Sequence, residues 1–590
     1  MTTASWSPSV WSSSSKIKSN SISLQIMSRK LTILLLTVLS SALLSVPFLV
    51  PGTGWLSLIA FVPLLWAEDI ATGDEMKGFC WWHYLCFVLW NAATTFWVCN
   101  ATVGGGIFAI LANAFQMSLI FGLFRWSRKW LSGALPYIFL AFAWIAWERW
   151  YLTDAQISWP WLVLGNAFAR TTGWIQWYEY TGTLGGSLLV WAANLSVFGI
   201  LESLASGRWM TFNLKAKSAA LLGTLALFVA PPIVSLFLKP EPCDETLDVV
   251  IAQPNIDPYN KFGGMTQEEQ NELLISQFEN IPDSVPVLLV APETFTGDVV
   301  TNSLSSSATV QRFTSFLAEH PNANLLVGAS SRTYLKRALK PSYTARPAGS
   351  GVWMESHNSA LMLDAFSYPE IFHKSKLVVA VEMTPYPAFF CKIDDWLGGV
   401  MGRCVGQKET GPLHFNEYSH ATESKDTMVA SDHLESRSMP DSDVPAQHVS
   451  VTETIPVGCA ICYESVYGEY CTRYVRNGAR LLTVITNDAW WGDTPGYKQH
   501  LSYSCLRAIE TRRWIARSAN TGISAIIDPS GKIVSQTSWW QPETLSGKVG
   551  LSDEKTFFVI HGDFIGRLST LMAVLILLAT LVRRFARQRI

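Results

Sequence analysis

Hydrophobic residues in this 590-residue chain gather in its first 240 residues and again at its C-terminal end. Eight apolar runs reach or approach the length of about 20 residues that a helix needs to cross a bilayer, so we expect about eight transmembrane helices. The second and fifth runs are short, which leaves a tilted or re-entrant path open for them. The runs occupy residues 31–50, 55–66, 79–98, 107–126, 135–147, 184–204, 219–238 and 568–582.

A different pattern begins after residue 240, where short apolar strands alternate with amphipathic helices. This alternation predicts a layered α/β fold. Thr266 and Glu269 have capping-box spacing, which predicts a helix from residue 267. We expect strands at 247–252, 285–290, 324–330, 359–364, 457–462, 481–485, 522–528 and 532–536, and helices at 307–319, up to 477 and at 501–517.

The two patterns divide the chain into four segments. Residues 1–26 are Ser-rich without apolar periodicity and are expected to be a disordered extension. Residues 27–240 form a transmembrane bundle of seven spans, and 241–560 form the α/β domain with a polar insertion at about 391–450. Residues 561–590 form a last transmembrane helix and a basic tail.

The segment 149–183 is too polar and too aromatic to span a membrane, with Trp159, Trp161 and Trp174 among its residues. Indole side chains favour the headgroup level. This segment is therefore either a plain interfacial belt or a lip that helps to bind lipid beneath the α/β domain.

Lys and Arg residues set the expected orientation, because short cytoplasmic loops are enriched in them. With eight spans, four basic clusters fall on one side, so the segment 239–565 is expected on the other, non-cytoplasmic side. The net charge of -2 indicates no basic face for nucleic acid, which we exclude as a partner. The clusters are Lys16, Lys18, Arg29 and Lys30; Arg125, Arg128 and Lys129; Arg208, Lys215 and Lys217; and Arg583, Arg584, Arg587 and Arg589.

Cysteine spacing singles out one thiol. Cys459 and Cys462 form a C-x-x-C without a second ligand pair at zinc-site spacing, so no metal is expected. Cys462 ends the strand from 457 and begins a polar-started helix, where the backbone dipole favours a thiolate. Taken alone, a cysteine in an apolar strand is more often a packing residue. Cys391 and Cys404 are a possible disulfide.

Three residues at or just after predicted strand ends together favour a catalytic role for Cys462 over a packing role. They are Glu293, Lys374 and Cys462. Strand ends are where α/β folds place their sites. A carboxylate, an ammonium and a thiol suffice for acyl transfer. Glu293 takes the thiol proton, Cys462 attacks a carbonyl, and Lys374 with a backbone N–H near Tyr463 stabilises the oxyanion.

Four ordered motifs carry a family resemblance: Pro292-Glu293-Thr294, Phe372-His373-Lys374 with Leu377 and Glu382, Ile461-Cys462-Tyr463-Glu464, and Asn487-Asp488-Ala489-Trp490. Together they resemble the carbon-nitrogen hydrolase (nitrilase) superfamily. With a multi-span bundle in front and one span behind, the chain resembles the apolipoprotein N-acyltransferase family of the bacterial inner membrane, over about residues 31–584.

The resemblance implies an αββα sandwich on the periplasmic face and a Glu-Lys-Cys triad that matches Glu293, Lys374 and Cys462. It also implies auxiliary or substrate-binding roles for further residues. Lys376 is a rival for the lysine position, but the aromatic-x-Lys motif favours Lys374. The chain departs from the family where Lys261-Phe262 replaces Lys-Trp. The auxiliary residues are Glu382, Tyr463, Glu464, Lys261, Phe262, Asn487 and Trp490.

The activity implied by the resemblance is a ping-pong acyl transfer through a cysteine thioester. A membrane phospholipid is the acyl donor and the N-terminal diacylglyceryl-cysteine of an apolipoprotein is the acceptor, and no metal or organic cofactor is expected. Two alternatives stay open. One is a membrane-anchored nitrilase or amidase that hydrolyses a C–N bond, and the other is a non-catalytic lipoprotein-binding scaffold.

Overall fold

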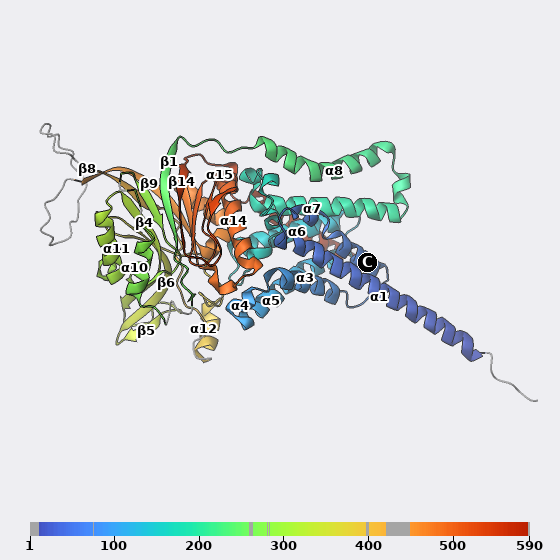
Figure 1. Ribbon diagram of the computed structural model, residues 1–590. Coiled ribbons are helices and arrows are strands. Elements are labelled where there is room, and N and C mark those ends of the chain that lie inside the picture. The colour runs from blue at the N-terminus through green and yellow to red at the C-terminus, as the bar shows by residue number, and fades with distance from the viewer. Residues whose placement is uncertain are drawn as a thin grey trace, which may run out of the picture.

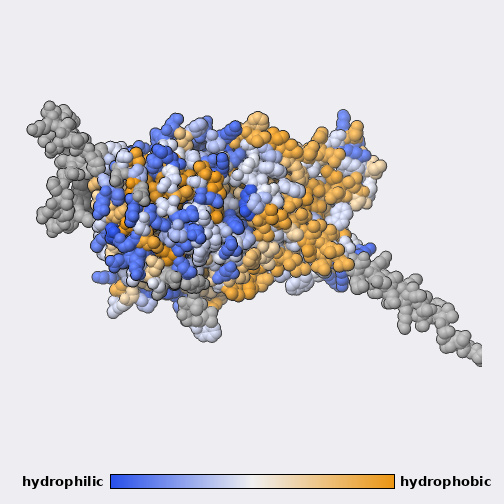
Figure 2. Space-filling view, viewed as in Figure 1, coloured by the Kyte–Doolittle hydropathy of each residue, from blue (hydrophilic) through white to orange (hydrophobic). Residues whose placement is uncertain are grey.

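The computed structural model describes residues 11–74, 76–258, 264–279, 281–282, 284–396, 401–420 and 449–587. It consists of a helical bundle and an α/β domain that lie end to end (Figure 1). Apolar side chains cover most of the visible surface of the bundle, whereas polar side chains dominate the α/β domain (Figure 2). This contrast is typical of a protein with one part in lipid and one part in water.

The bundle follows the apolar runs closely. Six helical segments of the described residues are long and apolar enough to span a membrane, so length and composition do not confirm the expected count of about eight. The other two are α3, which has 16 residues, and α6, which is rich in Trp and Tyr and contains Glu148 and Arg149. The main helices are α1 (Trp11–Leu49), α2 (Val62–Gly73), α3 (Cys80–Thr95), α5 (Val103–Ser127), α6 (Leu135–Thr153), α7 (Tyr178–Ala205), α8 (Leu214–Phe237) and α16 (Phe564–Arg587).

Short helices connect these long ones and face the α/β domain at several points. They are η1 (Gly54–Ile59), α4 (Val98–Ala101), η2 (Pro160–Leu162), η3 (Leu164–Phe168), η4 (Thr172–Trp174) and η5 (Arg208–Thr211). The segment 149–183 is therefore non-spanning after α6 ends, as its aromatic composition predicts.

The described part of the α/β domain contains two mixed sheets packed face to face. The first has the order β14-β1-β2-β4-β6-β5, with β3 on β4 and β7 on β6, and the second has the order β13-β12-β11-β10-β9-β8. Ser518 of β11 donates to the Ala252 carbonyl of β1 at 2.8 Å, which ties the sheets together. The first sheet comprises β1 (Glu245–Gln253), β2 (Val287–Val290), β3 (Thr296–Val300), β4 (Ala323–Lys336), β5 (Arg346–Gly349), β6 (Val352–Leu363), β7 (Glu370–His373) and β14 (Glu543–Leu551). The second comprises β8 (Leu413–His420), β9 (Val449–Ile461), β10 (Leu481–Thr486), β11 (Ile515–Ala519), β12 (Ala525–Ile527) and β13 (Ile533–Gln536).

Helices cover the outer faces of both sheets and complete an αββα sandwich, which confirms the fold expected from the sequence. Helices α10 (Gln267–Ser276) and α11 (Ala308–Glu319) cover the first sheet, and α13 (Gly468–Arg476) and α14 (Pro495–Thr511) lie on the second. Helix α14 stands between the second sheet and the bundle, with α15 (Phe557–His561) nearby (Figure 1). The capping box of Thr266 and Glu269 is present, as predicted.

Three local expectations were wrong. The helix expected at 501–517 ends at Thr511, because Arg512 adopts a left-handed conformation with φ 49° and the chain then enters β11. Part of the expected polar insertion is the edge strand β8, which pairs antiparallel with β9. Helix α1 begins at Trp11, so residues 11–26 continue the first span as helix instead of forming part of a disordered extension. Elongating an existing helix costs much less than nucleating one.

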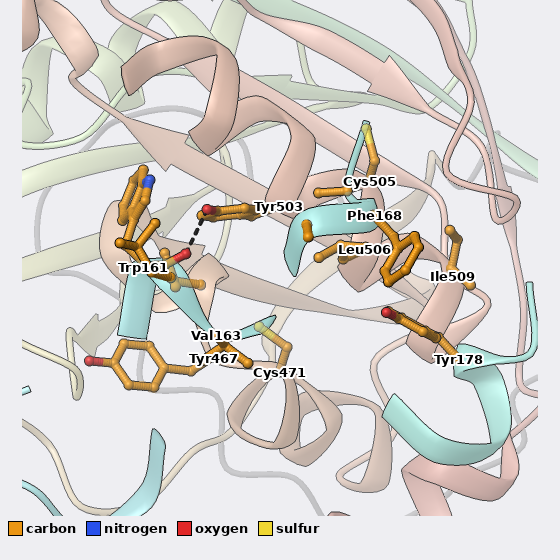
Figure 3. Close-up of a cluster of buried hydrophobic side chains, with 14 of the residues drawn as sticks. Trp161, Val163, Phe168, Tyr178, Tyr467, Cys471, Tyr503, Cys505, Leu506 and Ile509 are labelled. Carbon is orange, nitrogen blue, oxygen red and sulfur yellow. Dashed lines mark hydrogen bonds between the residues drawn. The ribbon is translucent and has the colours of Figure 1, made fainter. Parts of the chain in front are cut away.

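A buried aromatic and aliphatic cluster joins the bundle to the α/β domain (Figure 3). Tyr503 of α14 donates a hydrogen bond to the Trp161 carbonyl at 2.7 Å, and the Trp161 indole donates to Gln499 at 2.7 Å. Gln499 in turn donates to the carbonyls of Phe48 and Thr94 in the bundle. The α/β domain is thus held against the end of the bundle by buried hydrogen bonds as well as by apolar packing.

Candidate active site

The three candidate residues come from three strand ends that face one another across the sandwich. Glu293 follows β2, Lys374 follows β7 and Cys462 follows β9. Glu293 and Lys374 come from the first sheet and Cys462 from the second. The face-to-face packing of the sheets brings the three side chains close together. As a result, both Glu293 and Cys462 raise the pKa of Lys374.

Lys374 lies between two carboxylates. Its Nζ is 3.0 Å from Glu293 Oε1 and 2.9 Å from Glu382 Oε1, and the side chain is 1% exposed. Burial by itself lowers the pKa of Lys374, but Glu293 and Glu382 outweigh burial and hold that pKa well above its ordinary value. The lysine is therefore a permanent cation in this site and does not serve as a base.

Asn358 of β6 is a member of the site that the motifs did not reveal. Its Nδ2 donates to Glu293 Oε1 at 2.7 Å and to Glu382 Oε1 at 2.6 Å. Its backbone carbonyl accepts a hydrogen bond from the backbone N–H of Lys374 at 2.8 Å. The Asn487 N–H donates to the other oxygen of Glu293 at 3.2 Å. The only sequence signal for Asn358 is a polar residue at the start of the predicted apolar strand 359–364.

Cys462 is held in a strained conformation at the end of β9. Its φ is 51°, in the left-handed region that non-glycine residues rarely occupy, and it begins the short helix η7 (Cys462–Val466). Such strain persists where the surroundings over-determine the backbone, as they do at functional sites.

The thiol of Cys462 is not activated in the way that its position at a helix start suggests. Burial, and next the Glu293 carboxylate, raise the pKa of Cys462 well above its ordinary value, although Lys374 acts in the opposite direction. The expectation of a dipole-stabilised thiolate is therefore wrong. Desolvation outweighs the effect of a single short turn, and Glu293 is the carboxylate whose charge most affects the thiol.

Glu464 connects the lysine loop to the cysteine strand. Its Oε1 accepts from the Ser375 N–H at 2.6 Å and the Lys376 N–H at 3.1 Å, while Oε2 accepts from the Ile461 N–H at 2.9 Å. Burial raises the pKa of Glu464, and the Tyr470 hydroxyl, at 2.6 Å, stabilises the carboxylate. Glu464 thus fixes the positions of the backbones that carry Lys374 and Cys462.

Lys376, the rival lysine, lies elsewhere. Its Nζ donates to the Thr153 carbonyl at the end of α6 at 3.0 Å and stands 5.1 Å from the centroid of the Tyr467 ring. Burial lowers its pKa, and Arg473 adds to that effect. Lys376 joins the domain to the bundle, and Lys374 alone of the two contacts Glu293 and Glu382.

The remaining expected site residues differ in their placement. Tyr463 is buried, stacks on Trp159 with ring centroids 6.0 Å apart, and donates to the Ser158 carbonyl at 3.4 Å. Trp490 is 37% exposed beside the bundle contact. Lys261 and Phe262 lie outside the described residues.

Two further cysteine predictions can be compared with the structure. Cys391 and Cys404 are both free thiols, so the disulfide considered for them is absent, while Cys459 is buried in β9 as a packing residue. Among the described residues, no three His, Cys, Asp or Glu side chains group in a way that could hold a metal ion.

Comparison with known proteins finds matches for both parts of the chain. Residues 416–557 match the model of the carbon-nitrogen hydrolase family, and residues 40–196 match that of the apolipoprotein N-acyltransferase N-terminal domain. The chain is 26% identical over 544 residues to an apolipoprotein N-acyltransferase of Chlorobaculum tepidum, covering 90% of this chain and 92% of that one. It is 27% identical over 554 residues to that of Geobacter metallireducens, covering 90% and 91%.

A solved structure, that of Saccharomyces cerevisiae Nit3 of the nitrilase superfamily, aligns with 53% of this chain and 93% of its own, at 12% identity and a TM-score of 0.32. The αββα domain and its site define the class: a carbon-nitrogen hydrolase domain joined to a helical bundle that has the apolar surface of a membrane protein. Within that class, the chain belongs to the apolipoprotein N-acyltransferase family.

Proposed function

We propose that this protein transfers a fatty acyl chain from a membrane phospholipid to the N-terminal diacylglyceryl-cysteine of an apolipoprotein. The observation that carries the proposal is the placement of one buried cation, Lys374, between Glu293 and Glu382 beside a strained Cys462, in a domain that packs on an apolar bundle. Residues 241–560 are the catalytic domain in this proposal, and the names of the relatives agree with it.

In the first half-reaction, Glu293 takes the proton of the Cys462 thiol and the thiolate attacks the ester carbonyl of the phospholipid. The tetrahedral intermediate collapses by breaking the C–O bond, and the leaving alkoxide recovers the proton from Glu293 as a lysophospholipid. A thioester remains on Cys462. The raised pKa of the thiol makes this proton transfer to Glu293 part of the attack.

In the second half-reaction, the free α-amine of the diacylglyceryl-cysteine attacks the thioester carbonyl. Glu293 accepts a proton from the attacking amine, the C–S bond breaks, and the product amide leaves. The thiolate of Cys462 then takes this proton from Glu293. Lys374 stays charged in both halves and stabilises the oxyanion, together with the Tyr463 N–H. Glu382 and Asn358 hold the lysine side chain in place.

The acyl chains of donor and acceptor explain why the site stands at the end of a bundle. Both substrates stay in the bilayer, so the reacting carbonyl and amine must meet at its surface. We place the chain in the bacterial inner membrane with the α/β domain on the periplasmic face, as the positions of the basic loops indicate.

The test is incubation of the purified full chain with phospholipid, followed by intact mass measurement. We expect a fatty-acyl adduct that is lost in Cys462→Ala. Lys374→Met lowers the rate of adduct formation by at least about a hundredfold, because it removes the charge that stabilises the oxyanion. Lys376→Met is the matched control and retains adduct formation, since its amine contacts the bundle.

Two further measurements, of amide hydrolysis and of genetic complementation, separate the alternatives. Amide hydrolysis without a phospholipid-derived adduct indicates a membrane-anchored amidase that uses water as its acceptor. Full complementation of a strain lacking the activity by Cys462→Ala indicates a non-catalytic lipoprotein-binding scaffold. Either result contradicts the proposed transfer.

A further inference from the structure

The backbone carbonyl of Cys462 is held by one side chain of η7 and one of α14. Ser465 Oγ donates to it at 2.8 Å, and His500 Nε2 lies 3.1 Å from the same oxygen. Ser465 and His500 are fully buried. The carbonyl that follows the nucleophile is therefore fixed by two side chains to which the proposed mechanism gives no part.

His500 is itself held by a buried ionic cluster. Its Nδ1 lies 2.9 Å from Asp488 Oδ1, and Arg517 Nη2 donates to Asp488 Oδ2 at 2.7 Å. Burial raises the pKa of Asp488, but His500 and Arg517 outweigh burial and hold that pKa below its ordinary value. Asp488 is thus an ionised acceptor for the Nδ1 proton.

Further neighbours enclose the His500 ring. Ser465 Oγ lies 3.0 Å from its Nε2, and Arg517 Nη2 lies 3.2 Å from its Nδ1. The rings of Trp161 and Trp491 lie 5.7 Å and 5.4 Å from the imidazole. The His500 ring is therefore held in one place beside the Cys462 carbonyl.

The geometry of the peptide bond extends this contact to the site. In a trans peptide the C=O and the following N–H point in opposite directions. Fixing the Cys462 carbonyl toward His500 turns the Tyr463 N–H away from His500. The φ of 51° at Cys462 needs such external support, because a non-glycine residue does not hold that conformation by itself.

We propose that His500 and Asp488 are positioning residues that fix the Cys462–Tyr463 peptide so that its N–H faces the oxyanion of the acyl intermediate. This inference rests on the proposed acyl transfer. Neither residue touches the substrate, and both act through the backbone of the nucleophile.

The test compares two reactions of Cys462 in the full chain, both followed at this cysteine by peptide mass spectrometry. Acylation by a p-nitrophenyl fatty acyl ester forms an oxyanion, whereas alkylation by iodoacetamide displaces iodide and forms none. We expect His500→Leu to slow acylation about a hundredfold, as loss of an oxyanion donor does. Alkylation stays within about threefold of the rate of the natural chain, since the thiol and its base are unchanged.

Two further variants sharpen the comparison. His500→Gln keeps a side-chain amide that can donate to the Cys462 carbonyl and recovers part of the acylation rate. Ser502→Ala is the matched control, because Ser502 is buried on the same helix and, among the described residues, its hydroxyl donates to the Gln499 carbonyl one turn earlier. It leaves both reactions unchanged.

The outcomes separate the two proposals. Equal loss of acylation and alkylation in His500→Leu, or loss of neither, overturns the positioning role. If the natural chain accepts the p-nitrophenyl ester but no phospholipid, the proposed donor is wrong. The comparison at His500 still holds in that case, because it does not need the phospholipid.

Discussion

At the residue scale, the proposed mechanism gives one carboxylate two opposing effects on Cys462. The negative charge of Glu293 raises the pKa of the thiol, and the same carboxylate is the proposed base for the thiol proton. In this proposal, the cysteine stays protonated until an acyl donor is in place.

The effect of the Glu293 charge on the pKa of Cys462 can be tested with Glu293→Gln. Removing the negative charge leaves Lys374 as the nearest strong influence, so the pKa of Cys462 falls and its thiolate fraction at a given pH rises. We expect iodoacetamide to alkylate Cys462 faster than in the natural chain, with the rate profile displaced to lower pH. Acylation by phospholipid falls by about 10²–10⁴, the range for loss of a general base.

Glu382→Gln is the control for Glu293→Gln. Glu382 also contacts Lys374 but is not among the main influences on the pKa of Cys462. Its loss therefore leaves the alkylation profile much closer to that of the natural chain. An unchanged profile in Glu293→Gln contradicts the electrostatic account.

At the scale of elements, the turn after β2 is pressed against β4. A Cβ added to Gly328 of β4 would lie 2.5 Å from the Glu293 Cα and 2.6 Å from the Pro292 carbonyl oxygen. Both are backbone atoms that cannot rotate aside, so the position of Glu293 depends on a glycine in the neighbouring strand. The motif Pro292-Glu293-Thr294 alone does not reveal this requirement.

We expect Gly328→Ala to displace the Glu293 turn and lower the acylation rate about a hundredfold, the effect of a misplacement near 1 Å. Gly297→Ala in the adjacent strand β3 is the matched control, because a Cβ there has no heavy atom within 4 Å. Rates are measured from the growth of the acyl adduct. Equal rates in both variants would show that β4 does not position Glu293.

At the scale of the whole molecule, an ion pair and a hydrogen bond connect helix ends that carry the basic clusters and are therefore expected on one side of the membrane. Arg125 at the end of α5 contacts Glu68 in α2, 3.0 Å away. Both helix ends lie at one face of the bundle, which is the arrangement expected if α3 and α5 both cross the membrane. Arg587 at the end of α16 donates to the Lys129 carbonyl, 3.4 Å away, on the same face.

Helix α6 begins soon after Lys129 and ends at Thr153, which binds Lys376 of the α/β domain. It therefore runs from the basic face to the domain face. We infer that α3 and α6 cross the membrane despite their composition, because neighbouring helices bury the polar residues Asn91 and Glu148.

A reporter that is active only in the periplasm is expected to be active when fused after residue 300. A reporter that is active only in the cytoplasm is expected to be active when fused after residue 129. The basic clusters provide the physical reason, since Lys and Arg are retained on the cytoplasmic side. Activity of both reporters on the same side contradicts this topology.

The sequence by itself determined the class of the fold and predicted three residues of the candidate site, because apolar run lengths, strand–helix alternation and motif chemistry are local properties of the chain. The motif already favours Lys374 over Lys376, and tertiary structure alone shows that the two lysines, two residues apart, contact different partners. Asn358 and His500 likewise depend on the packing of separate strands and helices. Burial reversed the expected activation of Cys462, because desolvation depends on every neighbour of the thiol and on no local pattern.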